Sequence, residues 1–284
     1  MRFDLFVQRW ARRLPAYALL IVCSALVLFP VYVTIVDSLH PISEFLNNPP
    51  PSIWPNHPQW SNYFSHGGAA GAGTPLKRYL FNSFVMSVTI TIGQIITSVL
   101  AAYAFAFLRF PGRNVLFALF LATMMVPLEV AVIPNYQTIQ WLQWKNTYQG
   151  LVAPFLATGF GTFLLRQYFL TIPAELRDAA EMDGYGHWRF LTSIVVPLSL
   201  GAMATLAVFA FIQAWNQYLW PLLVTDDPNM RTVQIGIGTE ATQNLSKINV
   251  AFASTIVALI PMLLLVVAFQ RVLVRGIFGG ALKG

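Results

Sequence analysis

The residue best suited to specific chemistry is Glu129, an acidic side chain inside a long apolar stretch. It lies between Pro127 and Pro134, and prolines in a helix surrounded by lipid free backbone carbonyls and can open the helix. A carboxyl group in a hydrocarbon layer is costly and usually faces a cavity or a partner helix. Glu129 is therefore predicted either to contact a small polar substrate or to form a structural hydrogen bond with a neighbouring helix.

Several weaker candidates are amide or aromatic residues within apolar stretches. They are Asn82, Gln94, Asn135, Trp215, Asn216, Gln217, Tyr218 and Trp220. Amides at such positions most often bond one helix to another, and aromatic residues form belts near a membrane interface. The same aromatic rings can also form walls on which a polyol stacks, so both interpretations stay open.

Motifs for ordinary catalysis are missing from the sequence. It holds no HExxH pair, no GxSxG turn and no GxxxxGK[ST] phosphate loop. The four histidines fall in predicted loops, and the single cysteine, Cys23, excludes an intramolecular disulfide or a cysteine-based zinc cluster. We therefore expect no catalytic residue, no metal site and no ATP hydrolysis by this chain alone.

The composition is that of a membrane protein. Of 284 residues, 56% are hydrophobic and only 10% are charged, whereas soluble domains carry about a quarter charged residues. The formal net charge is +6, but clustered basic residues are missing, which argues against nucleic-acid binding.

The apolar stretches predict an all-α, multi-pass protein with six membrane-spanning helices. A span needs about 20 mostly apolar residues. Scanning the sequence gives residues 17–36, 80–108, 115–136, 148–170, 194–218 and 250–274. The second and fifth exceed the minimum, which predicts tilting or kinking.

Basic residues predict the orientation. Six spans place both termini on one side, and that side carries 12 Lys and Arg residues against 5 on the other. The positive-inside rule then predicts that both termini are cytoplasmic and that the protein lies in a plasma or inner cell membrane.

The first external loop, residues 37–79, is rich in Pro and Gly. Either a flexible tether or a surface for an external partner fits this composition.

The loop of residues 171–193, between the fourth and fifth spans, has a pattern of its own. Pro173 suits a first helical turn, and Glu175 and Asp178 complement the helix dipole. Gly184 is placed to end the helix. One face of this helix would carry Leu176, Ala179, Ala180 and Asp183, a shallow surface that another protein can approach closely. An interfacial connector helix is the alternative.

The motif Asp178-Ala-Ala-x-x-x-Gly184, followed by Ile194-x-x-Pro197, resembles the EAA loop of binding-protein-dependent ABC importer permeases. Asp178 stands where that family usually has Glu. The resemblance covers nearly the whole chain and implies one transmembrane domain, residues 1–284, with the loop as a coupling helix in a groove of an ATPase. The implied coupling residues are Glu175, Asp178, Ala179, Ala180, Asp183, Gly184 and Pro197.

The same resemblance implies the partners. They are a homologous second permease, two ATPase subunits that bind ATP and Mg, and an external substrate-binding protein, all within or against the lipid membrane. Sequences at residues 164–169 and 278–284 resemble the carbohydrate-type subgroup.

Four further stretches, residues 80–86, 109–114, 126–130 and 215–223, resemble permeases that import glycerol-3-phosphate. Sugar permeases tend to carry Gln at the position of Glu129. The implied substrates are glycerol-3-phosphate or glycerophosphodiesters such as glycerophosphocholine. The alternatives are a sugar or oligosaccharide importer, an intramembrane lipid-processing enzyme and an ion channel.

Overall fold

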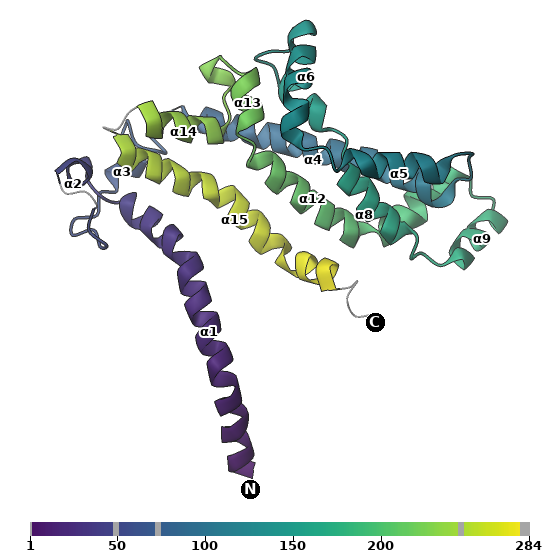
Figure 1. The fold of residues 1–284 in the computed structure, drawn as a ribbon, viewed down its shortest axis with the longest axis horizontal. Helices are drawn as coiled ribbons and strands as arrows, with labels where there is room; N and C mark the ends of the chain where they lie inside the picture. Colours follow the sequence, from purple (N-terminus) through teal and green to yellow (C-terminus); the bar gives the residue numbers. More distant parts are fainter. Residues whose placement is uncertain (1, 48–50, 72–74, 244–246, 279–284) are drawn as a thin grey trace. The chain divides into compact units, whose positions relative to one another are not determined.

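The computed structural model describes residues 2–47, 51–71, 75–243 and 247–278 (Figure 1). Every regular element within these residues is helical, as the all-α prediction requires. The chain divides into two compact units. The first comprises residues 1–76 and 237–259, and the second comprises residues 77–236 and 260–284.

Three helices are long and apolar enough to cross a membrane without a break. They are α1 (Arg2–Asp37), α4 (Leu76–Phe107) and α15 (Ile248–Phe278), with candidate spans Leu14–Asp37, Leu76–Phe107 and Ile248–Gln270. These confirm the helices predicted over residues 17–36, 80–108 and 250–274. Pro30 and Pro261 lie inside α1 and α15 without ending them.

The span predicted over residues 115–136 is interrupted, as the prolines within it indicate. It is two helices, α5 (Arg113–Thr123) and α6 (Leu128–Trp141). Pro127 is the residue before α6, and a proline has no N–H for the helix and disfavours helical geometry in the residue before it. Pro134, in contrast, lies inside α6.

The next two predicted spans are bent. In the first, α7 (Tyr148–Val152) and the 3-10 turn η1 (Ala153–Phe155) meet α8 (Gly159–Phe169) at 46°. The second runs through α10 (His187–Phe190), the π-helical turn η2 (Leu191–Val195) and α11 (Val196–Leu198). It then turns by 76° into α12 (Leu200–Trp215).

Five candidate spans result in the described residues if each bent pair is one span. A sixth requires α5 and α6 to cross together, so the number six stays a prediction.

Two groups of buried side chains organise the second unit. One joins the end of α4 to α8, α9 (Ala174–Met182) and α10. The other surrounds Trp220, on α13 (Leu219–Val224), with side chains of α4, α6 and α7. The remaining elements of this unit are η3 (Pro228–Met230) and the start of α14 (Val233–Gln243).

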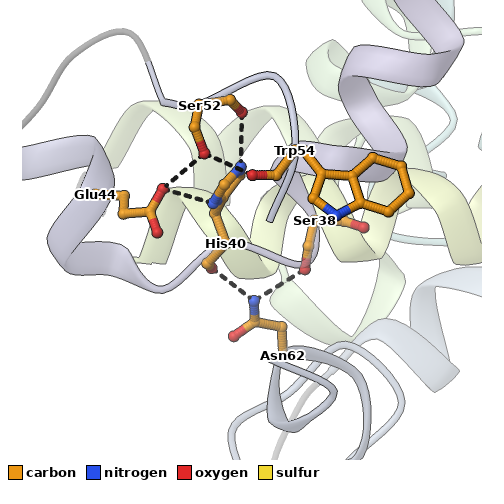
Figure 2. Close-up of polar contacts among 6 residues, drawn as sticks. All are labelled: Ser38, His40, Glu44, Ser52, Trp54 and Asn62. Carbon is orange, nitrogen blue, oxygen red and sulfur yellow. Dashed lines mark hydrogen bonds and ion pairs between the residues drawn. The ribbon is translucent and has the colours of Figure 1, made fainter. Parts of the chain in front are cut away.

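In the first unit, the segment that follows α1 is folded and not a flexible tether as far as it is described. It contains α2 (Ile42–Asn47) and α3 (Ser61–Phe64). The buried amide of Asn62 donates to the carbonyls of Ser38 and His40, at 2.9 and 3.0 Å (Figure 2). A Cβ on Gly71 would lie 1.8 Å from the Ser65 carbonyl oxygen, so glycine here permits close backbone packing.

Candidate functional site

Four of the predicted substrate-path residues line one cavity in the second unit. Its volume is about 130 Å³, and its polar wall consists of Glu129, Asn135, Gln217 and Tyr218. The rest of the lining is apolar and aromatic: Val132, Phe155, Leu219 and Trp220. A mostly apolar pocket with a few convergent polar groups is the usual form of a small-molecule site.

Glu129 owes its place in this cavity to the break before α6. It lies in the first turn of α6, where backbone N–H groups are free and the helix dipole stabilises a negative charge. The helix continues for twelve residues beyond Glu129, to Trp141, or about 18 Å at 1.5 Å per residue. The Glu129 side chain is exposed in this chain.

A second cavity, of about 400 Å³, shares Phe155 and Gln217 with the first. Gln94, Thr158 and Gln213 add polar groups to it. The side-chain oxygen of Gln217 is buried and has no hydrogen-bond partner among the described residues. An unsatisfied buried acceptor is costly, so a donor from a ligand, water or partner subunit suits this position.

Two predicted path residues lie elsewhere and have structural contacts. Asn82 is fully buried, donates to the carbonyls of Asn229 and Arg231 at 2.7 and 2.9 Å, and accepts from the Tyr148 hydroxyl at 2.7 Å. Trp215 is 2% exposed and stacks on Phe211. Neither lines the two cavities, so a substrate contact for them stays a prediction.

Asn216 is exposed near the first cavity and accepts a long hydrogen bond of 3.5 Å from Gln234. Its neighbour Gln217, which lines both cavities, is therefore better placed than Asn216 to contact a substrate.

Beyond α6, an ion pair joins the loop before α7 to the loop after α13. Lys145 Nζ lies 2.5 Å from Asp226 Oδ2, and this hydrogen bond raises the pKa of Lys145. Asn146 accepts from the backbone N–H groups of Asp226 and Asp227, at 2.7 and 2.9 Å. These contacts fix the segments on either side of the first cavity.

The α9–α10 loop follows the predicted helix-turn-helix closely. Pro173 precedes α9, and Gly184 has a φ of 75°, the left-handed geometry that ends helices at glycine. Past the ends of α5 and α8, α9 extends away from the helices (Figure 1). The predicted face needs one correction. Ala180 is only 4% exposed and packs into the buried group around Phe169 and Phe190, whereas Ala179 is exposed.

Three arginines cap the C-terminal end of α4. Arg166 Nε donates to the Phe105 carbonyl at 3.2 Å, Arg113 to Leu108 at 3.2 Å, and Arg177 of α9 to Phe107 at 3.4 Å. The last carbonyls of a helix lack intrahelical partners and carry partial negative charge, so cations stabilise this end. Through Arg177, the α9–α10 loop is bonded to α4, which lies about 70 residues earlier in the chain.

A second contact joins the same two regions. The Tyr103 hydroxyl lies 3.0 Å from Nδ1 of His187, and the ring of Phe107 packs edge-on against Phe190 at 5.4 Å. The π-helical turn η2 follows directly, and such turns recur at functional sites. A displacement of the loop can therefore reach α4 as well as α12.

Ala179 and Ala180 are expected to respond differently to arginine. Ala180→Arg places a cation in a buried apolar group and should lower the amount of folded protein several-fold. Ala179→Arg, on the exposed face, should leave folding unchanged and weaken association with a protein bound there. Comparing the recovery of each variant after detergent extraction with the recovery of the ATPase that the sequence resemblance implies checks this. Equal recovery of both variants would contradict the assigned burial.

Some site residues were not predicted. Phe155 and Gln213 line the cavities, and Arg177 and His187 contact α4. Gln213 and Gln217 are four residues apart, the spacing that places two side chains on one helical face, and this signal was available in the sequence. The contacts of Arg177 and His187 join residues 70 and 84 apart and have no local signal.

These features define a class of protein. Long apolar helices with interrupted helices around a polar cavity are the construction of a membrane transport permease, in which irregular backbone lines the substrate path. Residues 76–279 match the family described as binding-protein-dependent transport system inner membrane component. The chain belongs to this family and is an importer permease subunit.

Named relatives and solved structures agree with this assignment. The sn-glycerol-3-phosphate transport system permease protein UgpE of Yersinia enterocolitica is 41% identical over 92% of this chain and 94% of its own. UgpE of Agrobacterium fabrum is 40% identical over 93% and 95%. A bacterial ABC transporter that imports the acidic polysaccharide alginate has the same fold. The TM-score is 0.79, with 20% identity over 91% of this chain and 95% of that one.

Proposed function

We propose that this permease subunit serves an importer of glycerol-3-phosphate or of glycerophosphodiesters such as glycerophosphocholine. The observation that carries the proposal is the likeness to UgpE proteins along more than nine-tenths of the chain. The cavity at Glu129 is consistent with it, because carboxylate and amide groups bind the hydroxyls of a glycerol moiety.

The lining of the two cavities bears on how phosphate is bound. Among the residues that line them in the described structure, none is Lys or Arg. The N-terminus of α6 carries partial positive charge, but Glu129 lies in its first turn, and an ionised carboxylate there would repel phosphate. The full cation that a phosphate needs would then come from elsewhere in this chain or from the second permease subunit.

The α9–α10 loop is the coupling element of this proposal. Two ATPase subunits would bind ATP and Mg and close on each other, drawing on the exposed face of α9 that includes Ala179. The contacts of Arg177 and His187 would transmit that movement to α4, while η2 and the bend before α12 would pass it to the next span. An external binding protein delivers substrate, and the path opens alternately to each side.

A sugar or oligosaccharide substrate is the second candidate. The alginate importer shares the fold, and the aromatic and amide lining, with Phe155, Trp220 and Gln217, also suits a polyol. The carboxylate of Glu129 is the feature that favours the glycerol-phosphate class.

One experiment tests the proposal. The chain is purified with its co-expressed partners, reconstituted into proteoliposomes, and assayed for ATPase stimulation by the binding protein with each ligand. Glycerol-3-phosphate or glycerophosphocholine should stimulate hydrolysis, and maltose-type oligosaccharides should not. Stimulation by sugars alone would identify a sugar importer, and failure to recover an ATPase would contradict the proposed assembly.

The orientation has its own test. Both termini are proposed to be cytoplasmic, from the distribution of basic residues. With Cys23 replaced by alanine, Gly67→Cys should react with an impermeant thiol reagent in intact cells, and Gly284→Cys should react only after lysis. Gly67 suits this role because an added side chain there meets nothing within 4 Å. Labelling of Gly284→Cys in intact cells would overturn the topology.

A further inference from the structure

The segment after α1 forms an apolar tip at the C-terminal end of this helix. Ile53 is 74% exposed and Trp54 is 69% exposed, and they lie between Pro51 and Pro55. Large exposed apolar side chains next to each other require an explanation when their backbone is held in place.

The backbone of this tip is held by three hydrogen bonds to consecutive carbonyls. His40, which is fully buried, donates from Nε2 to the Ser52 carbonyl at 2.9 Å (Figure 2). The Tyr32 hydroxyl donates to the Ile53 carbonyl at 2.9 Å, and the Ser52 hydroxyl to the Trp54 carbonyl at 2.7 Å. These three carbonyls are thus satisfied internally while the side chains of Ile53 and Trp54 are exposed. This is the arrangement that irregular backbone needs in contact with lipid.

The bond from Tyr32 sets the depth of the tip. Tyr32 is five residues before Asp37, the end of α1, or about 7.5 Å along the helix. The α1 surface below it is apolar and exposed, with Leu26 and Val27 at 70% and 74%. The tip therefore continues a lipid-facing surface at the level where tryptophan is enriched, the membrane–water interface.

The charge of the surface around Ile53 and Trp54 indicates whether lipid or a soluble protein contacts it. From Phe45 to Leu76 the sequence holds no Asp, Glu, Lys or Arg. The nearest acidic group, Glu44, turns inward, with Oε2 2.7 Å from Nδ1 of His40. Soluble protein partners are usually steered and oriented by complementary charges. A charge-free surface with an exposed tryptophan suits the headgroup region of a bilayer.

We propose that Ile53 and Trp54 form an interfacial anchor that inserts into the headgroup region of the leaflet at the C-terminal end of α1. The basic-residue distribution predicts this leaflet to be the external one. The anchor fixes the depth and tilt of α1 and, through His40 and Tyr32, the position of the folded segment that follows it.

Site-specific quenching tests the anchor in the full complex. With Cys23 replaced by alanine, Ile53→Cys and His66→Cys are each labelled with an environment-sensitive fluorophore and placed in lipid nanodiscs. His66 is exposed in the same folded segment and serves as the control. We expect spin-labelled lipid to quench the label at residue 53 at least twofold more than the label at residue 66. Aqueous iodide should show the reverse preference.

A further substitution tests the bond that sets the depth. Tyr32→Phe removes one hydroxyl from α1 and should reduce lipid quenching at residue 53 while leaving residue 66 unchanged. Two results would overturn the proposal. One is equal iodide quenching at both positions. The other is protection of residue 53 from both quenchers, with cross-linking to the second permease or to the binding protein.

Discussion

Replacing Gly184 by valine is expected to reduce uptake by the assembled importer about tenfold or more, and replacing it by proline should abolish uptake. Gly184 has a φ of 75°, which costs other L-residues roughly 1–2 kcal/mol, more for β-branched ones, and which proline, fixed near −65°, cannot adopt. Either change should redirect the chain between α9 and α10. Uptake of labelled substrate by proteoliposomes containing the full complex measures the effect.

The same turn provides a matched control. Gly186 has a φ of −74° and a ψ of 169°, which any residue adopts, and an added Cβ would meet nothing within 4 Å. Gly186→Ala should therefore transport at nearly the wild-type rate. Membrane fractionation should recover all three variants equally, which separates a coupling defect from failed insertion. Normal uptake by Gly184→Pro would show that the α9–α10 turn plays no part in coupling.

Structural features that depend on a few neighbouring residues could be predicted from the sequence. The long helices α1, α4 and α15 follow from uninterrupted hydropathy. The end of α9 follows from Gly184, because few other residues accept a positive φ. The prediction of a substrate path at Glu129 likewise used local information, a carboxyl group in an apolar stretch, and the cavity around it brings in Asn135, Gln217 and Tyr218.

The breaks in the helices could not be predicted from residue types alone. Pro30, Pro134 and Pro261 lie inside continuous helices, while Pro127 starts a new one. A proline's effect depends on whether neighbouring groups satisfy the carbonyls that it frees, and those neighbours come from distant parts of the chain.

The direction in which individual side chains point could not be predicted from the sequence either. Helical periodicity placed Ala179 and Ala180 on one face, but it could not say which of them the chain itself would cover. Asn82 was predicted as a path residue from its polarity within a span. Its partners Asn229 and Arg231 are almost 150 residues away, so their contact with it had no signal in the sequence.

The second large effect is expected at Glu129. Glu129→Ala should lower uptake of every substrate about tenfold or more, because removing the side chain leaves a bound hydroxyl without its hydrogen-bond partner, at a cost of about 1–3 kcal/mol. Glu129→Gln keeps a hydrogen-bonding group of the same size but removes the charge. It should be mild for glycerol-3-phosphate, which has no cation, and severe for glycerophosphocholine, whose ammonium pairs with the carboxylate. Uptake and substrate-stimulated ATPase activity are measured for both substrates.

Gln140→Ala is the matched control for these variants, because Gln140 is exposed on the same helix, α6, and does not line the first cavity. It should leave uptake and stimulated hydrolysis near the wild-type level. The position of Glu129 at the start of α6 makes the comparison with glutamine informative, since the helix dipole stabilises a negative charge there. If Glu129→Gln impairs the two substrates equally, the charge acts on the permease and not on the choline group. Wild-type transport by Glu129→Ala would leave Glu129 as a structural residue and remove the main support in this chain for a glycerol-phosphate substrate.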